Sequence, residues 1–175
     1  MRHRVLITLL CVATLAIYST SCKIGYSFTG ASLSPEIKTF FVDFFPNRAR
    51  IVNPKLSQAF QEKLTDKFSN ELGLTSQRNG GDIEFSGQIV RYETRPLGIE
   101  TSSDGRDIAG QSRFTIGVRV KFVNNINHDQ DFNQTFTAYE DFTASQSFAS
   151  IEDEYVEVIL EKIITDIFNK SAANW

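Results

Sequence analysis

The chain has 175 residues, of which 41% are hydrophobic and 22% are charged, and its formal net charge is −3. This length fits one globular domain with an ordinary core, and the negative balance excludes nucleic-acid binding through bulk charge. Residues 1–21 hold two of the 18 basic residues and none of the 21 acidic ones, so the rest of the chain has a net charge of −5.

The first 21 residues have the organisation of a cleavable signal peptide. Basic residues within 1–4 precede an uncharged apolar run at 5–17, which is shorter than the roughly 20 residues that a helical bilayer span needs. Small polar residues follow at 19–21 and end at Cys22. We predict that Cys22 becomes the lipidated first residue of the mature protein, although Ser19 departs from the usual Leu; an ordinary secretory signal is the alternative.

Cysteine usage supports a lipid at this position. Cys11 lies in the segment to be removed, so Cys22 would be a lone thiol in an oxidising compartment. Lipid modification consumes that thiol, and several acyl chains hold a protein firmly on a bilayer. The predicted organisation is a signal peptide at 1–21, the lipidated cysteine with a short N-terminal segment at 22–34, and a single α+β domain at 35–175.

The mature chain opens with a strand followed by a helix. Aromatic and β-branched residues crowd 37–45 and predict the first strand. Asn53 suits a helix cap, Pro54 the first helical position, and Gly73 the C-terminal end. Apolar residues recur at every fourth position between them, which predicts a helix lying on a sheet: Leu56, Phe60, Leu64, Phe68 and Leu72.

Three further strands are predicted from the alternation of apolar and polar residues, at 82–89, 114–122 and 132–143. The first of them follows the turn signal at 79–81, and the last follows a polar turn at 124–131. The polar loop at 97–112 is longer than an ordinary hairpin connection, which indicates either function or disorder.

A second helix is predicted to begin at Ser150. Asp153 stands three residues later, in a variant of the capping box, and the acidic run at 152–154 complements the positive end of a helix dipole. Apolar residues from 151 to 167 make a broad face. The element order is β-α-β-β-β-α, and its simplest packing is an α+β fold with two helices on one face of a mainly antiparallel four-stranded sheet.

Residues that carry catalytic or metal chemistry are scarce. After residue 21 the chain has one histidine, His128, and one cysteine, Cys22, whereas nucleophilic triads and zinc sites need more of these groups. The Asn and Asp run at 124–131 offers oxygen ligands but lacks the Gly and Glu of an EF-hand loop, which favours a solvated turn. We expect no catalytic residue, no metal site and no cofactor.

A local basic excess stands out in this acidic chain, around the second and third predicted strands. Each residue taken singly fits a solvated sheet face. As a group they suit phosphate recognition, because guanidinium groups bind phosphate in a forked geometry. We take them as a candidate contact with an anionic lipid or with an acidic surface of a partner: Arg91, Arg95, Arg106, Arg113, Arg119 and Lys121.

Short motifs are spread from Cys22 to the last residue: Gly25-Tyr26-Ser27-Phe28-Thr29-Gly30, Ser32-Leu33-Ser34-Pro35, Lys38-Thr39, Asn53-Pro54 with Leu56-Ser57 and Phe60, Glu84-Phe85-Ser86-Gly87, Val120-Lys121-Phe122, Ser150-Ile151-Glu152-Asp153-Glu154, Asp166-Ile167-Phe168-Asn169 and Ala173-Asn174-Trp175. In order and spacing they resemble the LptE-type lipopolysaccharide-assembly lipoproteins of the Bacteroidetes kind.

The resemblance implies a fold of two helices against a sheet. It also implies an outer-membrane lipoprotein on the periplasmic face, anchored through the lipid on Cys22. Such a protein enters the lumen of a large LptD-like β-barrel translocon, plugs it, helps it to assemble, and assists the passage of lipopolysaccharide. The basic group remains an inference from charge, as a candidate contact with lipopolysaccharide or with the partner.

Two alternatives remain open at this point. The first is a periplasmic lipoprotein that holds a lipid or small apolar ligand between helices and sheet and binds no barrel. The second is an enzyme built around His128.

Overall fold

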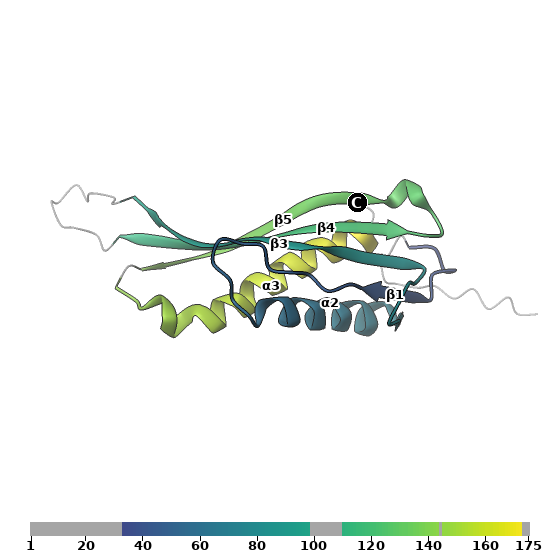
Figure 1. Cartoon of the computed structure of the whole chain (residues 1–175), viewed down its shortest axis with the longest axis horizontal. Helices are drawn as coiled ribbons and strands as arrows, with labels where there is room; N and C mark the ends of the chain where they lie inside the picture. Colours follow the sequence, from purple (N-terminus) through teal and green to yellow (C-terminus); the bar gives the residue numbers. More distant parts are fainter. Residues whose placement is uncertain (1–32, 99–109, 144, 173–175) are drawn as a thin grey trace, which may run out of the picture. The chain divides into compact units, whose positions relative to one another are not determined.

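The helices and the sheet form two layers, with both helices on the same side of the sheet (Figure 1). This arrangement comes from a computed structural model, which describes residues 33–98, 110–143 and 145–172. The elements in chain order are β1 (Thr39–Val42), α2 (Leu56–Leu72), β2 (Thr75–Ser76), β3 (Ile83–Leu97), β4 (Gln111–Asn124), the 3-10 turn η1 (His128–Gln130), β5 (Phe132–Thr143) and α3 (Phe148–Ala172). The predicted signal peptide and Cys22 lie outside the described residues. None of the described helices has a stretch that is long and apolar enough to cross a bilayer.

The sheet is mixed, and its strand order is β2-β1-β3-β4-β5. β1 runs parallel to β2 and β3, whereas β3, β4 and β5 are antiparallel. The predicted α+β class with a mainly antiparallel sheet is confirmed, with five strands in place of the expected four. The additional strand, β2, has two residues, and the Thr75 N–H donates to the Lys38 carbonyl at 2.9 Å. A strand this short shows no periodic pattern in the sequence.

β3 is longer than predicted because a β-bulge reverses its alternation. The register with β4 shifts between Ile89 and Arg91. Before the shift Ile89 faces the helices, and after it Tyr92 does, both almost fully buried. The apolar positions therefore change from odd to even, and the predicted strand 82–89 ends where the pattern breaks. The predicted loop 97–112 is shorter than expected at both ends, because Leu97 belongs to β3 and pairs with Gln111 of β4. Residues 99–109 of this loop lie outside the described residues.

Aromatic rings fill the space between the two layers. The Phe45 and Phe60 ring centroids lie 4.8 Å apart, those of Phe68 and Phe85 4.7 Å apart, and those of Phe85 and Phe122 5.0 Å apart. All five side chains are fully buried. Burial of a side chain of this size stabilises a fold by roughly 1.5–3 kcal/mol, so this layer of rings accounts for much of the driving force for folding.

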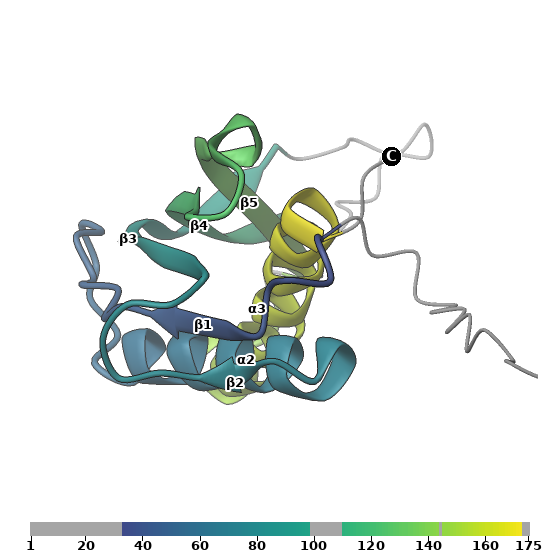
Figure 2. The ribbon, with the colours of Figure 1, turned by 90° about the vertical axis from the view of Figure 1, so that its right-hand side faces the viewer.

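α2 lies against β1 and β2 (Figure 2). Its ends are close to the predicted ones. Gly73 closes it in the left-handed region, with φ 65° and its N–H bonded to the Ser69 carbonyl, as predicted. The helix begins at Leu56, two residues after Pro54. Asn53 nevertheless caps the preceding turn, because its Oδ1 accepts the Lys55 N–H at 3.0 Å.

α3 packs on β4 and β5 and begins earlier than predicted. Ser150 is not its cap: its Oγ donates to the Ser147 carbonyl at 2.7 Å from inside the first turn. Phe148 explains the difference, since its ring lies 4.9 Å from that of Phe114 and 5.8 Å from that of Phe142. Packing of this ring on the sheet extends the helix towards its N-terminus.

Candidate functional site

The predicted basic group gathers on the outer face of the sheet, which we define as the face turned away from α2 and α3. Inward-facing pairs such as Phe85 opposite Phe122 are buried, and the alternate positions point outward. Arg106 lies outside the described residues. The other five residues lie on the outer face: Arg91, Arg95, Arg113, Arg119 and Lys121.

The bulge in β3 is what brings two of these arginines to the outer face. Before the bulge the odd-numbered side chains, such as Ile89, point to the core. Without the register shift, Arg91 and Arg95 would also point to the core. With it, Arg91 lies opposite Gly117 and Arg95 lies opposite Arg113. The sequence contains the arginines, but periodicity alone does not predict their side.

One end of the outer face is occupied by ion pairs. Arg113 donates from Nε to Oδ1 of Asp141 at 2.7 Å and from Nη2 to Oδ2 at 2.9 Å, and its guanidinium lies 3.6 Å from the Tyr139 ring centroid. This pairing raises the pKa of Arg113 and holds the pKa of Asp141 below its ordinary value. Arg95 approaches Glu93 at 3.0 Å. These two arginines are therefore held by neighbouring carboxylates.

The other end of the outer face presents cations among uncharged hydrogen-bonding groups. Arg119 and Lys121 are exposed, and they lie on the same face of β4 because one residue, Val120, separates them. Their cross-strand neighbours are neutral polar residues: Gln88 and Ser86 on β3, Thr135 and Asn133 on β5. Within the part of the chain that the structure describes, neither cation forms an ion pair with a carboxylate.

Arg91 lies beside these cations, 3.6 Å from Glu93 through its Nε. Gly117, which lies next to it, leaves little room for a side chain, because an added Cβ would approach Arg91 Cβ to 3.1 Å and Thr137 Oγ1 to 3.2 Å. We call Arg91, Arg119 and Lys121 the basic patch. Its chemistry suits an anionic ligand with several oxygens, such as a phosphate.

The Asn and Asp run at 124–131 uses its oxygens to build a turn. Asn124 Oδ1 accepts the N–H groups of Ile126 and Asn127 at 2.9 and 3.0 Å, and Asp131 Oδ1 accepts the Asn124 N–H at 2.7 Å. His128 is exposed, with Nδ1 3.1 Å from the Asp131 carboxylate. The described residues contain no group of three or more potential metal ligands. The geometry agrees with a solvated turn.

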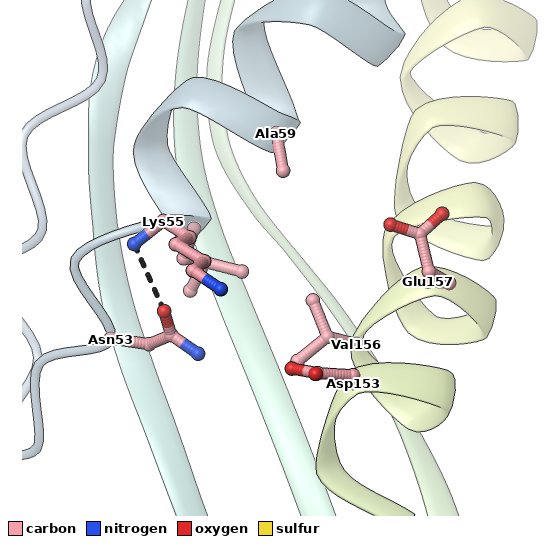
Figure 3. A pocket seen from close by; sticks show the side chains of 7 residues that line it. Asn53, Lys55, Ala59, Asp153, Val156 and Glu157 are labelled. Carbon is pink, nitrogen blue, oxygen red and sulfur yellow. Dashed lines mark hydrogen bonds between the residues drawn. The ribbon is translucent and has the colours of Figure 1, made fainter.

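A shallow groove opens between the N-terminal ends of α2 and α3 (Figure 3). Its volume is about 220 Å³, and it is lined by Asn53, Lys55, Leu56, Ala59, Asp153, Val156 and Glu157. Small-molecule pockets usually measure about 300–1,000 Å³. Among the described residues, a groove this small does not favour the alternative of an apolar ligand held between the helices and the sheet.

A polar cluster that the sequence analysis missed lies beside this groove. The buried Tyr92 hydroxyl donates to the Glu152 carboxylate, and Asn53 Nδ2 lies 3.2 Å from the hydroxyl and 3.3 Å from Glu152 Oε1. Burial and the bond to Glu152 raise the pKa of Tyr92 well above its ordinary value. The three residues come from distant parts of the chain, so no local motif indicates the cluster.

Comparison with known proteins yields one family and several related folds. A family model described as "LptE: Lipopolysaccharide-assembly" matches residues 37–171. No curated protein matches the chain in sequence.

Three solved structures are similar at low identity. A hypothetical protein from Chlamydia trachomatis has 11% identity and a TM-score of 0.52, over 79% of this chain and 99% of that chain. A protein from Xanthomonas campestris has 11% identity and a TM-score of 0.50, over 75% and 81%. A minor lipoprotein from Acinetobacter baumannii has 9% identity and a TM-score of 0.46, over 77% and 91%. The first two show that the fold recurs.

Proposed function

The chain belongs to the LptE lipopolysaccharide-assembly family, and from this membership we propose that it is an outer-membrane lipoprotein that plugs a large LptD-like β-barrel translocon and helps it to assemble. In this proposal, residues 1–21 are removed and a lipid on Cys22 holds the protein on the periplasmic face. The protein is not an enzyme, and it acts through the surfaces that it presents to the barrel and to lipopolysaccharide.

The observation that carries the lipopolysaccharide contact is the basic patch. Lipopolysaccharide is anionic, and its phosphate groups are suitable acceptors for guanidinium and ammonium donors. Arg119 and Lys121 are exposed and have neutral polar neighbours. Their donors are available to such a ligand without breaking an ion pair among the residues that the structure describes.

Among the described residues, the inner side of the sheet offers little space for a lipid. The side chains between helices and sheet form one continuous buried cluster, and the groove at its margin measures about 220 Å³. A ligand the size of an acyl chain would have to displace packed rings such as Phe60 and Phe68. The basic patch is the reason for which we assign recognition to the outer face.

The barrel partner is tested by co-purification of the full lipoprotein through a tag placed after Trp175. We expect a large outer-membrane β-barrel to be retained with the tagged chain. The Cys22→Ala variant should fail to incorporate radiolabelled palmitate and should leave the membrane fraction. If no barrel is retained from detergent-solubilised membranes, the plug function is wrong.

The lipopolysaccharide contact is tested by charge reversal on the outer face. The double variant Arg119→Glu/Lys121→Glu should bind purified lipopolysaccharide at least about tenfold more weakly, because two attractive contacts become repulsive. The matched control is Lys55→Glu/Lys170→Glu, which changes the net charge equally on exposed residues of the helical layer. Equal losses in the two variants would indicate an effect of net charge alone.

A further inference from the structure

β5 is the last strand of the sheet, and its outer edge is open among the described residues. Its twelve residues, Phe132–Thr143, pair with β4, and no described strand pairs with its other side. A strand of this length with an unpaired edge presents a row of backbone donors and acceptors to any extended chain.

Two hydrogen bonds at the end of β4 identify which residues of β5 face that edge. The Asn125 N–H donates towards β3, to the Asp82 carbonyl, and the Asn124 N–H donates towards the β5 side, to Asp131 Oδ1. The even-numbered residues of β4 therefore form their backbone hydrogen bonds with β5. The residues of β5 that lie opposite them are also even-numbered, so these direct their N–H and C=O groups towards β4. The odd-numbered residues of β5 direct their N–H and C=O groups out of the sheet. The Tyr139 carbonyl agrees, since Lys162 Nζ approaches it at 3.4 Å.

β5 itself lacks the residues that normally protect an edge strand, and Lys162 of α3 reaches one of its edge carbonyls, that of Tyr139. The strand has no Pro, Lys, Arg or Gly, and these residues commonly discourage pairing at an edge. Both of its charged residues form ion pairs, Asp141 with Arg113 and Glu140 with Lys162. The edge is thus electrically neutral and rich in Thr and aromatic residues, which favour β-structure.

The sequence of β5 is complementary to itself about Thr137. Antiparallel pairing of two copies with Thr137 opposite Thr137 gives the following opposed residues: Thr135 with Tyr139, Asn133 with Asp141, Phe136 with Ala138, Gln134 with Glu140, and Phe132 with Phe142. Each carboxylate meets an amide, the two outermost positions pair aromatic rings, and no like charges are opposed. In this register the edge-facing, odd-numbered residues oppose one another, as backbone hydrogen bonding requires.

From this complementarity we propose that β5 pairs with β5 of a second copy of the chain, antiparallel and centred on Thr137. The two sheets then become one continuous sheet. The outer faces of the two copies lie on the same side of it, so the basic patches also share one face. This self-association does not depend on the barrel or on lipopolysaccharide.

Cysteine substitution on the full lipoprotein in membranes tests the register. Paired residues in an antiparallel ladder have Cα atoms about 5.5 Å apart, within the range of a disulfide. Thr137→Cys should therefore give a disulfide-linked homodimer on mild oxidation. Thr135→Cys is the matched control, because the two copies of residue 135 would lie four positions apart, about 13 Å. The unsubstituted chain controls for Cys22.

A mixed experiment makes the register test stricter. Chains with Thr135→Cys and chains with Tyr139→Cys should crosslink to each other and not to themselves. Homodimers of all three variants in equal amounts would mean random collision, and no homodimer of Thr137→Cys would overturn the pairing.

A charge at the centre of the interface provides a second, independent measurement. Thr137→Lys puts like charges opposite each other and should raise the dimer dissociation constant in detergent roughly tenfold or more. Thr115→Lys, on β4 of the same face, should leave it unchanged. If Thr137→Lys instead releases the barrel and Thr137→Cys crosslinks to the barrel, the edge binds that partner and the self-pairing is wrong.

Discussion

The Tyr92 hydroxyl donates a hydrogen bond to the Glu152 carboxylate, and this bond joins β3 to α3 just beyond the β3 bulge. Asn53 donates to the same carboxylate from the turn before α2. The sheet and both helices thus meet in one partly buried polar contact. An unsatisfied polar group at such a position costs more than its hydrogen bond contributes when formed.

Replacing Tyr92 by Phe should destabilise the fold by about 1–2 kcal/mol, because the Glu152 carboxylate loses one of its two donors and only Asn53 still bonds to it. Thermal unfolding should show a decrease of roughly 2–8 °C in the melting temperature. Tyr139→Phe is the control, since the Tyr139 side chain is 47% exposed. Equal melting temperatures for both variants would mean that the buried bond contributes nothing.

The hydrogen bonds that Asp82 accepts lead us to expect that the folded protein loses stability in acid. Asp82 Oδ2 accepts the N–H groups of Lys38 and Thr39 at 2.8 and 2.9 Å and the Thr39 hydroxyl at 2.9 Å. The Lys38 bond is the largest cause of a pKa below the ordinary value for Asp82. A lowered pKa means that this stabilisation is present above about pH 4 and is lost as the pH falls through the folded-state pKa.

Asp82→Asn should therefore lower stability by about 1 kcal/mol at pH 7 and flatten the acid limb of the stability curve. Urea unfolding between pH 7 and pH 2 measures both effects. Asp129→Asn, in the exposed turn η1, should leave the curve as it is in the unsubstituted chain. An acid limb that keeps its slope in Asp82→Asn would refute the assignment.

The sequence predicted features that depend on local repetition. The alternation in β4 places Val118 in the core, and the stripe on α2 places Phe60 there, each with 0% exposure. The left-handed C-terminus of α2 at Gly73 was predictable because glycine is favoured in that conformation.

Features that depend on distant contacts were not predictable. Phe148 extends α3 because it finds a site between Phe114 and Phe142 on the sheet. The register shift after Ile89 reverses the side on which Arg91 lies. Both facts depend on how strands pair, and the periodicity of one segment carries no information on the segment beside it.

Gly87 should tolerate no side chain. Its φ is 155°, and an added Cβ would lie 2.0 Å from the Arg119 carbonyl oxygen and 2.8 Å from a carbon of the Phe45 ring. Gly87→Ala must displace the backbone of β4, so we expect destabilisation of about 3 kcal/mol or more. Gly110→Ala, whose added Cβ meets no atom of the described residues within 4 Å, should change stability by less than about 0.5 kcal/mol. Chemical denaturation of both variants distinguishes the two sites.

Substitutions of Arg113 and Arg119 should have different effects, the first on thermal stability and the second on ligand binding. Arg113 is held by Asp141 and by the Tyr139 ring, so Arg113→Ala should lower the melting temperature and leave the affinity for lipopolysaccharide within about twofold, a change of roughly 0.4 kcal/mol. Arg119 lies opposite the neutral residues Gln88 and Thr135, so Arg119→Ala should leave the melting temperature unchanged.

The affinity of Arg119→Ala for lipopolysaccharide should fall by about threefold to tenfold, because the variant loses one charge-assisted contact at an exposed site. That loss should shrink as salt is raised, since exposed charges are screened within about 10 Å at 0.1 M. Isothermal titration at two salt concentrations measures both. If Arg113→Ala weakens binding as much as Arg119→Ala does, the ligand engages the whole outer face, and the ion pair with Asp141 must open to admit it.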